Sequence, residues 1–385
     1  MNPLYAEMPT TIFEKMSALS RDLGAINLGQ GFPDSNGPPD VVDAAVRALT
    51  ELSNQYPPMV GLPQLRQAVA NHYARHQGIA LDWASEVTVT SGATEALAAA
   101  ILALVTPGDE VVLIEPMYDA YLPLVIRAGG VPRFVRLEPP HWRLTEEALA
   151  AAFTPRTRLA ILNNPLNPTA TMFSNEELGL LATYVVRSDA VLISDEVWEH
   201  LVFDGARHLP VMAQPGMRER TVKIGSGGKI FSLTGWKVGW MCAAPELTRV
   251  LAKAHQFLTF TTPPNLQAGV AYGLGKDDAY FTGMRADFAR SRDRLAAGLE
   301  ASGWRVLPSA GTYFLSVDLP ASGVAADDVT FCERAVREAG IAAIPISAFY
   351  HADPVTSVVR LCFAKRDETV DGGIERMAKA RALFA

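Results

Sequence analysis

The feature that most constrains the fold of this chain is an alternation of apolar runs and helical patterns between residues 82 and 243. The apolar runs are short and rich in β-branched residues or leucine, and they lie at 87–90, 110–115, 158–163 and 190–195. Between the last two, Ser174-Asn175-Glu176-Glu177 is a capping box that predicts a helix start. This alternation predicts an α/β fold with a mostly parallel, mixed sheet between helices.

Polar residues follow the predicted strands where such a sheet binds its ligands. In open α/β sheets, ligands bind beyond the carboxyl ends of the strands. The residues found there are Gly92, Ala93, Thr94, Tyr118, Asn167 and Asp195. Several of them also have ordinary interpretations: a capped helix start for 91–95, an Asn-Pro turn for Asn167 and a core aromatic for Tyr118. Together they predict a ligand site at this edge of the sheet.

A glycine-rich segment at 222–240 holds Ser226, Lys229 and Lys237. Its pattern predicts a short strand, a turn that holds Ser226 and Lys229, and a second strand that begins near Lys237. Glycines let the backbone approach a ligand closely, and the two amines favour an anion. An amine at such a turn is typical of a lysine that forms a Schiff base. The alternative is a turn with solvated lysines.

Three motifs of similar composition are excluded. A Walker A loop needs a glycine where Lys223 stands and Ser or Thr where Ile230 stands. A Gly-x-Ser-x-Gly elbow needs a glycine at Ile224. No helix opens on Gly29-Gln30-Gly31, so this stretch is not a dinucleotide fingerprint. We expect a loop there whose backbone amides face a ligand.

After residue 245 the pattern changes to a smaller α+β region. The predicted elements are a helix to about 257, a loop at 261–264, a long helix at 277–302, strands at 312–317, 341–344 and 358–363, and a helix from 367. The 385 residues suffice for two domains. We expect an N-terminal arm that is also part of the small domain at 1–35, a large domain at 36–272 and a small C-terminal domain at 273–385.

Composition limits the partners and the compartment. A net charge of −7 without a basic cluster argues against nucleic acid and membrane surfaces as partners. No basic region followed by an apolar core is visible near Met1, so a signal peptide is not expected. Cys242, Cys332 and Cys362 are widely spaced, which fits buried thiols in a reducing compartment. We therefore expect a cytoplasmic location.

Metal ligands are not indicated by spacing. His72 and His76 share one face of a predicted helix, but the sequence offers no third ligand near them. No His-Glu-x-x-His motif is present either. No metal site is therefore predicted.

The lysine segment resembles a known family. Ser-x-x-Lys followed by Ser-x-Thr-Gly-Trp-Lys-x-Gly is similar to the lysine signature of the class I/II aminotransferases, the fold-type I enzymes that use pyridoxal 5'-phosphate (PLP). Further motifs are Asn-Leu-Gly-Gln-Gly-Phe-Pro-Asp, Asn-Gln-Tyr, Gly-Ala-Thr-Glu-Ala, Asp-Glu-Val and Gly-Thr-Tyr-Phe. They run in order along nearly the full chain and resemble most the branch of kynurenine, methionine and N-succinyldiaminopimelate aminotransferases.

A PLP site needs a lysine, a phosphate site, a carboxylate at the ring nitrogen, donors to the phenolic oxygen and an aromatic platform. We expect Lys229 to be the catalytic lysine and Asp195 to keep the ring nitrogen protonated. The phosphate would be bound by Gly92, Ala93, Thr94, Ser226 and Lys237, at a helix N-terminus. Asn167 would donate to the phenolic oxygen, and Tyr118 would stack on the ring.

The resemblance also implies contacts that spacing does not indicate. Arg360 would bind the substrate α-carboxylate, which suits a guanidinium fork. Gly31 would offer its backbone N–H to the same carboxylate, with Asn167 nearby. Tyr56 would reach the phosphate in the neighbouring subunit, which makes the expected active unit a homodimer.

Three residues depart from the family pattern. Trp198 stands at a cofactor-binding position where tyrosine is usual, and indole can donate one hydrogen bond but cannot accept or titrate as a phenol can. Ala170 replaces the usual glycine after Asn-Pro-Thr, and Lys237 replaces the commoner arginine. We expect the first departure to change the pH dependence of the cofactor.

The resulting prediction is a PLP-dependent aminotransferase that moves the amino group of an amino acid to a 2-oxo acid by a ping-pong mechanism. The expected donors have a bulky or uncharged side chain, such as methionine, kynurenine or an aromatic amino acid, or are N-succinyldiaminopimelate. One alternative is a PLP-dependent carbon–sulfur β-lyase acting on cystathionine or cysteine conjugates. Another is a PLP-binding regulatory domain, which would need a fused basic DNA-binding module, and none precedes Asn27.

Overall fold

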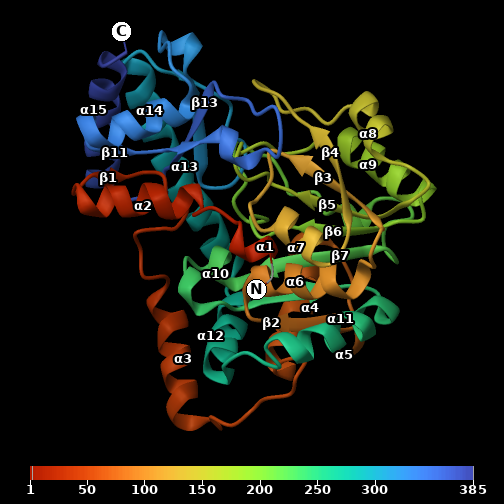
Figure 1. The fold of residues 1–385 in the computed structure, drawn as a ribbon. Helices are drawn as coiled ribbons and strands as arrows, with labels where there is room; N and C mark the ends of the chain where they lie inside the picture. Colours follow the sequence, from red (N-terminus) through yellow and green to blue (C-terminus); the bar gives the residue numbers. More distant parts are fainter. Residues whose placement is uncertain (2, 385) are drawn as a thin grey trace.

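The computed structural model describes residues 1 and 3–384; Asn2 and Ala385, within the predicted regions 1–35 and 273–385, lie outside the described residues. A seven-stranded sheet with the order β2-β8-β7-β6-β5-β3-β4 forms the centre of the larger part (Figure 1). Neighbouring strands are parallel except at β8, which is antiparallel to β2 and to β7. The strands are β2 (Val87–Thr90), β3 (Glu110–Glu115), β4 (Val131–Arg136), β5 (Thr157–Asn163), β6 (Val191–Asp195), β7 (Thr221–Ser226) and β8 (Gly239–Cys242). The predicted α/β class and mostly parallel sheet are confirmed.

Helices cover both faces of this sheet because its central strands are apolar on both sides. In β5, Leu159 and Ile161 pack in the core that contains α6, while Ala160 and Leu162 pack in the core that contains α9. The helices of this part are α3 (Pro39–Glu51), α4 (Pro63–Gln77), α5 (Trp83–Glu86), α6 (Gly92–Leu104), α7 (Tyr121–Arg127), α8 (Glu146–Ala152), α9 (Asn175–Arg187), α10 (Gly227–Ile230), α11 (Pro245–Leu258) and α12 (Pro264–Leu274). The capping box predicted at Ser174 is present at the start of α9.

Helix α12 was not predicted: the predicted loop at 261–264 is irregular only over 261–263, and the helix begins at Pro264. Two glycines lower its intrinsic helix propensity. Tertiary packing requires them: a Cβ on Gly269 would lie 2.9 Å from Ala45 Cβ, and a Cβ on Gly273 would lie 2.7 Å from Phe231 Cζ. Strand β4 was also missed. The residue Lys229 lies in the one-turn helix α10 rather than in an irregular turn, and Ser226 is the last residue of β7.

The two chain ends meet in a smaller region. Strand β1 (Ile26–Asn27) pairs in parallel with β11 (Ile341–Ala342), and the α2 helix lies beside them (Figure 1). A four-stranded sheet has the order β12-β13-β10-β9. The elements here are α2 (Ile12–Asp22), α13 (Asp278–Ala301), β9 (Arg305–Val306), β10 (Phe314–Asp318), α14 (Asp328–Arg334), β12 (Ile344–Pro345), β13 (Val358–Cys362) and α15 (Asp367–Ala382). The short helix α1 (Pro3–Ala6) precedes α2 and lies apart from these elements in Figure 1. The boundaries at 35 and 272 remain a prediction.

Within the described residues, no helix combines the length and the apolar character needed to cross a membrane.

Candidate active site

The site lies at the edge of the large sheet where the parallel strands end. Registers place the strand ends side by side: Asn163 pairs with Asp195, and Gly239 faces both Thr90 and Ser226. A cavity of about 100 Å³ lies beyond this edge. Its lining contains seven of the predicted site residues, Ala93, Thr94, Tyr118, Asn167, Asp195, Trp198 and Lys229.

Lys229 reaches this cavity from α10. The preceding glycines are needed because a Cβ on Gly227 would lie 2.7 Å from Val270 Cγ1, and one on Gly228 would lie 3.1 Å from the Leu233 carbonyl oxygen. The Lys229 amine donates a hydrogen bond of 3.1 Å to the Tyr313 hydroxyl and lies 4.5 Å from the ring centroid of Trp198. Burial lowers the pKa of Lys229 to about 8. The unprotonated form of the amine is therefore more populated near neutral pH than in an ordinary lysine.

Asp195, the last residue of β6, is buried and only 5% exposed. The Tyr121 hydroxyl donates a 2.7 Å hydrogen bond to Asp195 Oδ2, and the Val197 N–H donates to Oδ1 at 3.4 Å. Burial raises the pKa of Asp195 to about 6, against the effect of these donors and of Lys229. Tyr121 was not predicted. Its only signal was a second aromatic shortly after Tyr118 at the start of α7.

Arg360 lies on β13 and is 1% exposed. Its Nη1 donates to Asn167 Oδ1 at 2.7 Å, and its Nη2 donates to the Gly29 carbonyl at 2.9 Å. The guanidinium carbon lies 3.9 Å from the Phe314 ring centroid, and Nε is buried without a partner among the described residues. Burial lowers the pKa of Arg360 to about 10, so the side chain remains cationic at neutral pH. It can therefore bind a carboxylate.

Tyr313 connects the Arg360 region to Lys229. Its hydroxyl accepts from the Lys229 amine and donates to the Gly31 carbonyl. Gly31 fits only without a side chain, because a Cβ would lie 2.7 Å from Phe314 Cζ. Tyr313 belongs to the Gly-Thr-Tyr-Phe motif, but no role was predicted for it.

The start of α6 lies close to the start of β8, where the phosphate-binding residues were predicted. Gly92 has a φ of +78°, and a Cβ on Gly239 would lie only 2.8 Å from Gly92 C and 2.9 Å from Ala93 N. The Lys237 side chain approaches from the same side, since a Cβ on Gly92 would lie 3.4 Å from its amine. Ser226 lies next to Gly239 across the β7–β8 pair. Free N–H groups, an amine and a hydroxyl therefore converge, as a phosphate requires.

The departures from the family pattern have visible consequences. Ala170 has a φ of +62°, a conformation that glycine adopts readily and alanine at a cost of about 1 kcal/mol. The turn is retained because the Ala170 carbonyl accepts from the N–H groups of Ala310 and Gly311. The Trp198 ring lies edge-on to Tyr313, with centroids 4.4 Å apart.

Tyr56 lies outside the cavity. It is 83% exposed in the loop between α3 and α4, and its ring contacts that of Phe260 with centroids 5.5 Å apart. Within this chain, the structure does not bring it to Lys229.

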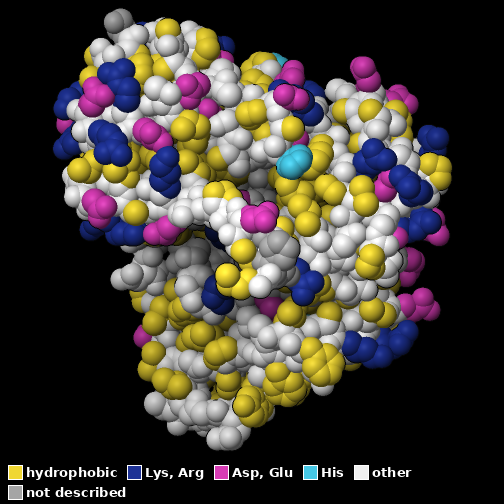
Figure 2. All heavy atoms as spheres, in the orientation of Figure 1, with side chains coloured by type: hydrophobic (Ala, Val, Ile, Leu, Met, Phe, Trp, Pro, Cys, Tyr) yellow, Lys and Arg dark blue, Asp and Glu magenta, His cyan; other side chains and the backbone are white. Residues whose placement is uncertain are grey.

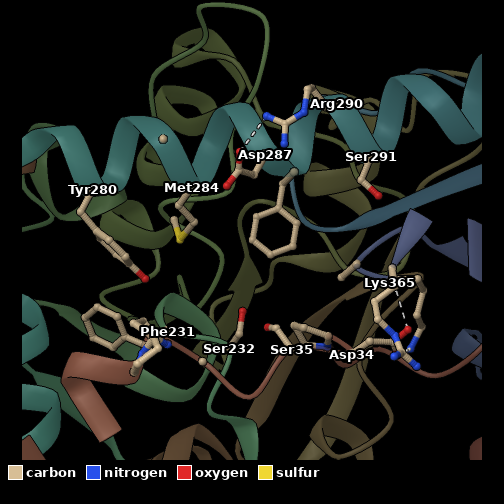
Figure 3. Close-up of a pocket in the computed structure, with 18 of the residues that line it drawn as sticks. Asp34, Ser35, Phe231, Ser232, Tyr280, Met284, Asp287, Arg290, Ser291 and Lys365 are labelled. Carbon is tan, nitrogen blue, oxygen red and sulfur yellow. Dashed lines mark hydrogen bonds and ion pairs between the residues drawn. The ribbon is translucent and has the colours of Figure 1, made fainter. Parts of the chain in front are cut away.

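A larger cavity of about 910 Å³ lies between α13 and the N-terminal arm (Figure 3). None of the predicted site residues lines it. Figure 3 shows two ion pairs at its wall, Arg290 with Asp287 and Lys365 with Asp34. Because these charges are already paired, the smaller cavity at Lys229 is the better candidate for catalysis.

Comparisons with known proteins show the family of the chain. The model of the family described as "Aminotransferase class I and II" matches residues 24–377. A Mycobacterium tuberculosis protein named "Probable N-succinyldiaminopimelate aminotransferase DapC" is 46% identical over 96% of each chain. The methionine aminotransferase of Escherichia coli is 41% identical, again over 96% of each chain. The solved structure of N-succinyldiaminopimelate aminotransferase from M. tuberculosis matches with a TM-score of 0.94 over 98% of this chain and 99% of that one.

Proposed function

The chain belongs to the class I and II aminotransferases, and we propose that it uses PLP to move the amino group of an uncharged or bulky amino acid to a 2-oxo acid. That it is a transaminase of amino acids follows from the family match and from relatives at 46% and 41% identity. The observation that carries the cofactor proposal is one half-buried amine, Lys229, facing the same cavity as the buried carboxylate of Asp195.

The residues present fit PLP. In our proposal Gly92, Ala93, Thr94, Ser226 and Lys237 hold its phosphate, which the close backbone approach at Gly239 supports. Asn167 accepts from Arg360 through Oδ1, so its Nδ2 remains available to donate to the phenolic oxygen. Tyr118 and Trp198 line the same cavity as aromatic neighbours of the ring. When bound, PLP would supply an electron sink for the substrate carbon that loses its proton.

Lys229 and Asp195 would have different roles in the proton transfers. The Lys229 amine, with its lowered pKa, would take the α-proton of the substrate and return a proton in the second half of the cycle. Asp195 would hold a proton at the ring nitrogen by its negative charge, oriented by the Tyr121 hydroxyl. Tyr313 would orient the Lys229 amine.

Arg360 would bind the α-carboxylate, with the Gly31 backbone N–H beside it. The fork is oriented by Asn167 and the Gly29 carbonyl and is covered by the Phe314 ring. The Lys229 cavity is lined in part by apolar and aromatic side chains, among them Leu97, Tyr118 and Trp198, which supports donors with an uncharged or bulky side chain. Methionine, kynurenine and aromatic amino acids fit this description. The M. tuberculosis relative favours N-succinyldiaminopimelate as a further donor to test.

We also propose a homodimer with shared sites. Exposed apolar side chains gather in the lower part of Figure 2, over α3, α11 and α12 of Figure 1. Exposed apolar residues on α3, on α11 and in the segments that follow these helices include Leu49, Leu52, Tyr56, Phe257 and Phe260. A contiguous surface of this kind is typical of a subunit interface, and Tyr56 would project from it toward the phosphate of the partner subunit. The three free, buried thiols support a reducing compartment such as the cytosol.

A half-reaction screen tests the function. Purified holoenzyme is mixed with kynurenine, methionine or N-succinyldiaminopimelate, and the visible absorbance of the cofactor is followed without an acceptor. We expect a stoichiometric loss of that absorbance with at least one donor and recovery on addition of 2-oxoglutarate. Lys229→Ala should reduce turnover by about 10⁴-fold or more. Colourless protein after PLP treatment would contradict the proposal, and release of pyruvate and ammonia from cystathionine without an acceptor would instead favour the β-lyase.

A further inference from the structure

Three histidines from distant parts of the sequence meet beside α4. His72 and His76 lie one turn apart on that helix, and His200 lies in the turn that follows β6. Nε2 of His72 is 2.7 Å from Nε2 of His200, and one ring nitrogen of each histidine lies within 4.8 Å of the other two. The ring centroids are 4.5, 4.8 and 5.0 Å apart. The third ligand that was lacking near His72 and His76 in the sequence is thus supplied by the fold.

Burial disfavours the protonated form of all three histidines. Burial lowers the pKa of His72 to about 3 and that of His200 well below its ordinary value. His76 is less buried, and its pKa is also lowered, first by burial and then by Arg75. Each neutral imidazole has a lone pair on one ring nitrogen, and this is the form that binds metal ions.

We propose that His72, His76 and His200 bind one divalent transition-metal ion, with Zn²⁺ as the best match. Tetrahedral Zn²⁺ with bonds of about 2.0–2.1 Å needs ligand nitrogens about 3.4 Å apart. The His72–His200 pair therefore has to open by about 0.7 Å, and the third nitrogen has to move inward. In the hydrogen bond between His72 and His200, only one of the two Nε2 atoms carries a proton. When the metal binds, this proton moves to Nδ1 of the same ring.

The surroundings leave a fourth coordination position for water. His76 and His200 line an open cavity of about 870 Å³, which shares no lining residue with the Lys229 cavity. The Phe281 ring stacks on His200 with centroids 4.6 Å apart and covers the other side. A metal here would connect α4 to the turn that contains Trp198, so we infer a structural role.

A neighbouring cluster of Glu196, Glu199 and His208 does not carry the same inference. The buried Lys223 amine contacts Glu196 and lies 3.1 Å from Glu199, so this cluster already contains a cation.

Arg75 provides an internal control for the histidine site. Its guanidinium donates to His76 Nε2 at 3.0 and 2.8 Å and adds a positive charge beside the cluster. Arg75 is exposed, and its guanidinium also donates to the Lys276 carbonyl at 2.7 Å and lies 3.4 Å from Asp278, so it has partners other than His76 when the metal binds. Replacing it with glutamine removes both the competing donor and the repulsion. Arg75→Gln should therefore bind the metal more tightly than the wild type.

Equilibrium dialysis of untagged, chelator-treated holoenzyme against Zn²⁺ tests the proposal, with Co²⁺ as a spectroscopic probe of coordination. We expect one Zn²⁺ per chain and an affinity at least about tenfold lower in His76→Ala and in His200→Gln. The exposed His141 gives the matched control His141→Ala, which should bind as the wild type does. Zn²⁺ should raise the Tm of the wild type and of His141→Ala, but not that of His76→Ala.

The proposal is overturned if the wild type shows no saturable binding at one ion per chain. Equal affinities of His76→Ala and His141→Ala would overturn it as well. Since His76 is only half-buried, we expect its alanine variant to fold. The test is therefore decisive even if the His200→Gln variant does not fold. Apoenzyme prepared without PLP should give the same Zn²⁺ affinity, so that failure of the site is distinguishable from failure of the proposed cofactor chemistry.

Discussion

The Tyr121 hydroxyl donates a 2.7 Å hydrogen bond to Oδ2 of Asp195, and both side chains are buried. This donor lowers the pKa of Asp195, which burial raises to about 6. The carboxylate proposed to hold the ring nitrogen protonated therefore depends on a tyrosine for its own ionisation.

Tyr121→Phe should raise the pKa of Asp195 further, so less of it is ionised at pH 7. A hydrogen bond to a charged group contributes about 1.5–3 kcal/mol, which corresponds to at least about one pH unit. In a plot of PLP affinity against pH, the fall in affinity at the acid side should therefore occur about one pH unit higher than in the wild type. Tyr118→Phe, which leaves this bond intact, is the control. A fall at the same pH in Tyr121→Phe and in the wild type would contradict the assignment.

Gly239→Ala should weaken PLP binding by about tenfold or more. The new Cβ would lie 2.8 Å from Gly92 C and 2.9 Å from Ala93 N, and backbone atoms cannot move aside cheaply. The start of β8 must then separate from the start of α6, where the phosphate is proposed to bind. In the same segment Gly235 has open space around it, so Gly235→Ala should titrate with PLP as the wild type does. Fluorescence titration with PLP measures both constants, and equal losses in the two variants would argue against the phosphate site.

Arg360→Lys should lower kcat/KM by about 10²- to 10³-fold, chiefly through KM. Lysine keeps the charge but loses the fork that contacts Asn167 and Gly29, and truncating such a buried pair costs about 2–5 kcal/mol. The same exchange at the exposed Arg366 should have no effect. Steady-state kinetics with the best donor gives the comparison. A loss confined to kcat would exclude a role in substrate binding.

Trp198→Tyr should shift the pH titration of the holoenzyme's visible absorbance. The Trp198 ring lies 4.5 Å from the Lys229 amine, whereas a phenol could donate to the phenolic oxygen of the cofactor. A donor to the deprotonated oxygen favours that form, so the midpoint should fall, by about one pH unit. Trp198→Phe should show no such fall. Superimposable curves for wild type and Trp198→Tyr would disprove the hypothesis.

Mixing Tyr56→Phe chains with Lys229→Ala chains tests the shared site. If Tyr56 acts in the partner's site, each mixed dimer contains one intact site and one doubly altered site. An equimolar, re-equilibrated mixture should then recover about one quarter of wild-type activity at limiting PLP. Unmixed samples of each variant are the controls. Activity equal to the average of those samples would mean that Tyr56 does not complete a site across the interface.

Much of the site could be predicted because its signals are local. The alternation between residues 82 and 243 predicted the sheet, and residues that directly follow strands were expected to meet at one edge. Lys229, Asp195 and Thr94 do line one cavity there. The roles of Arg360 and Gly31 were predicted only from the family resemblance, because nothing in the sequence around them indicates a ligand.

What the sequence determined by itself was the alternation of strands and helices between residues 82 and 243, with β4 missed, and a lysine within a glycine-rich segment that follows a strand. The tertiary structure alone decided which distant side chains meet: Tyr121 with Asp195, Tyr313 with Lys229, and His200 with His72. It also turned the two-glycine segment at 264–274 into a helix by packing it against Ala45 and Phe231. The reason is that periodicity and turn chemistry act over a few residues, whereas hydrogen-bond partners and burial, and with them every shifted pKa, are set by residues far away along the chain.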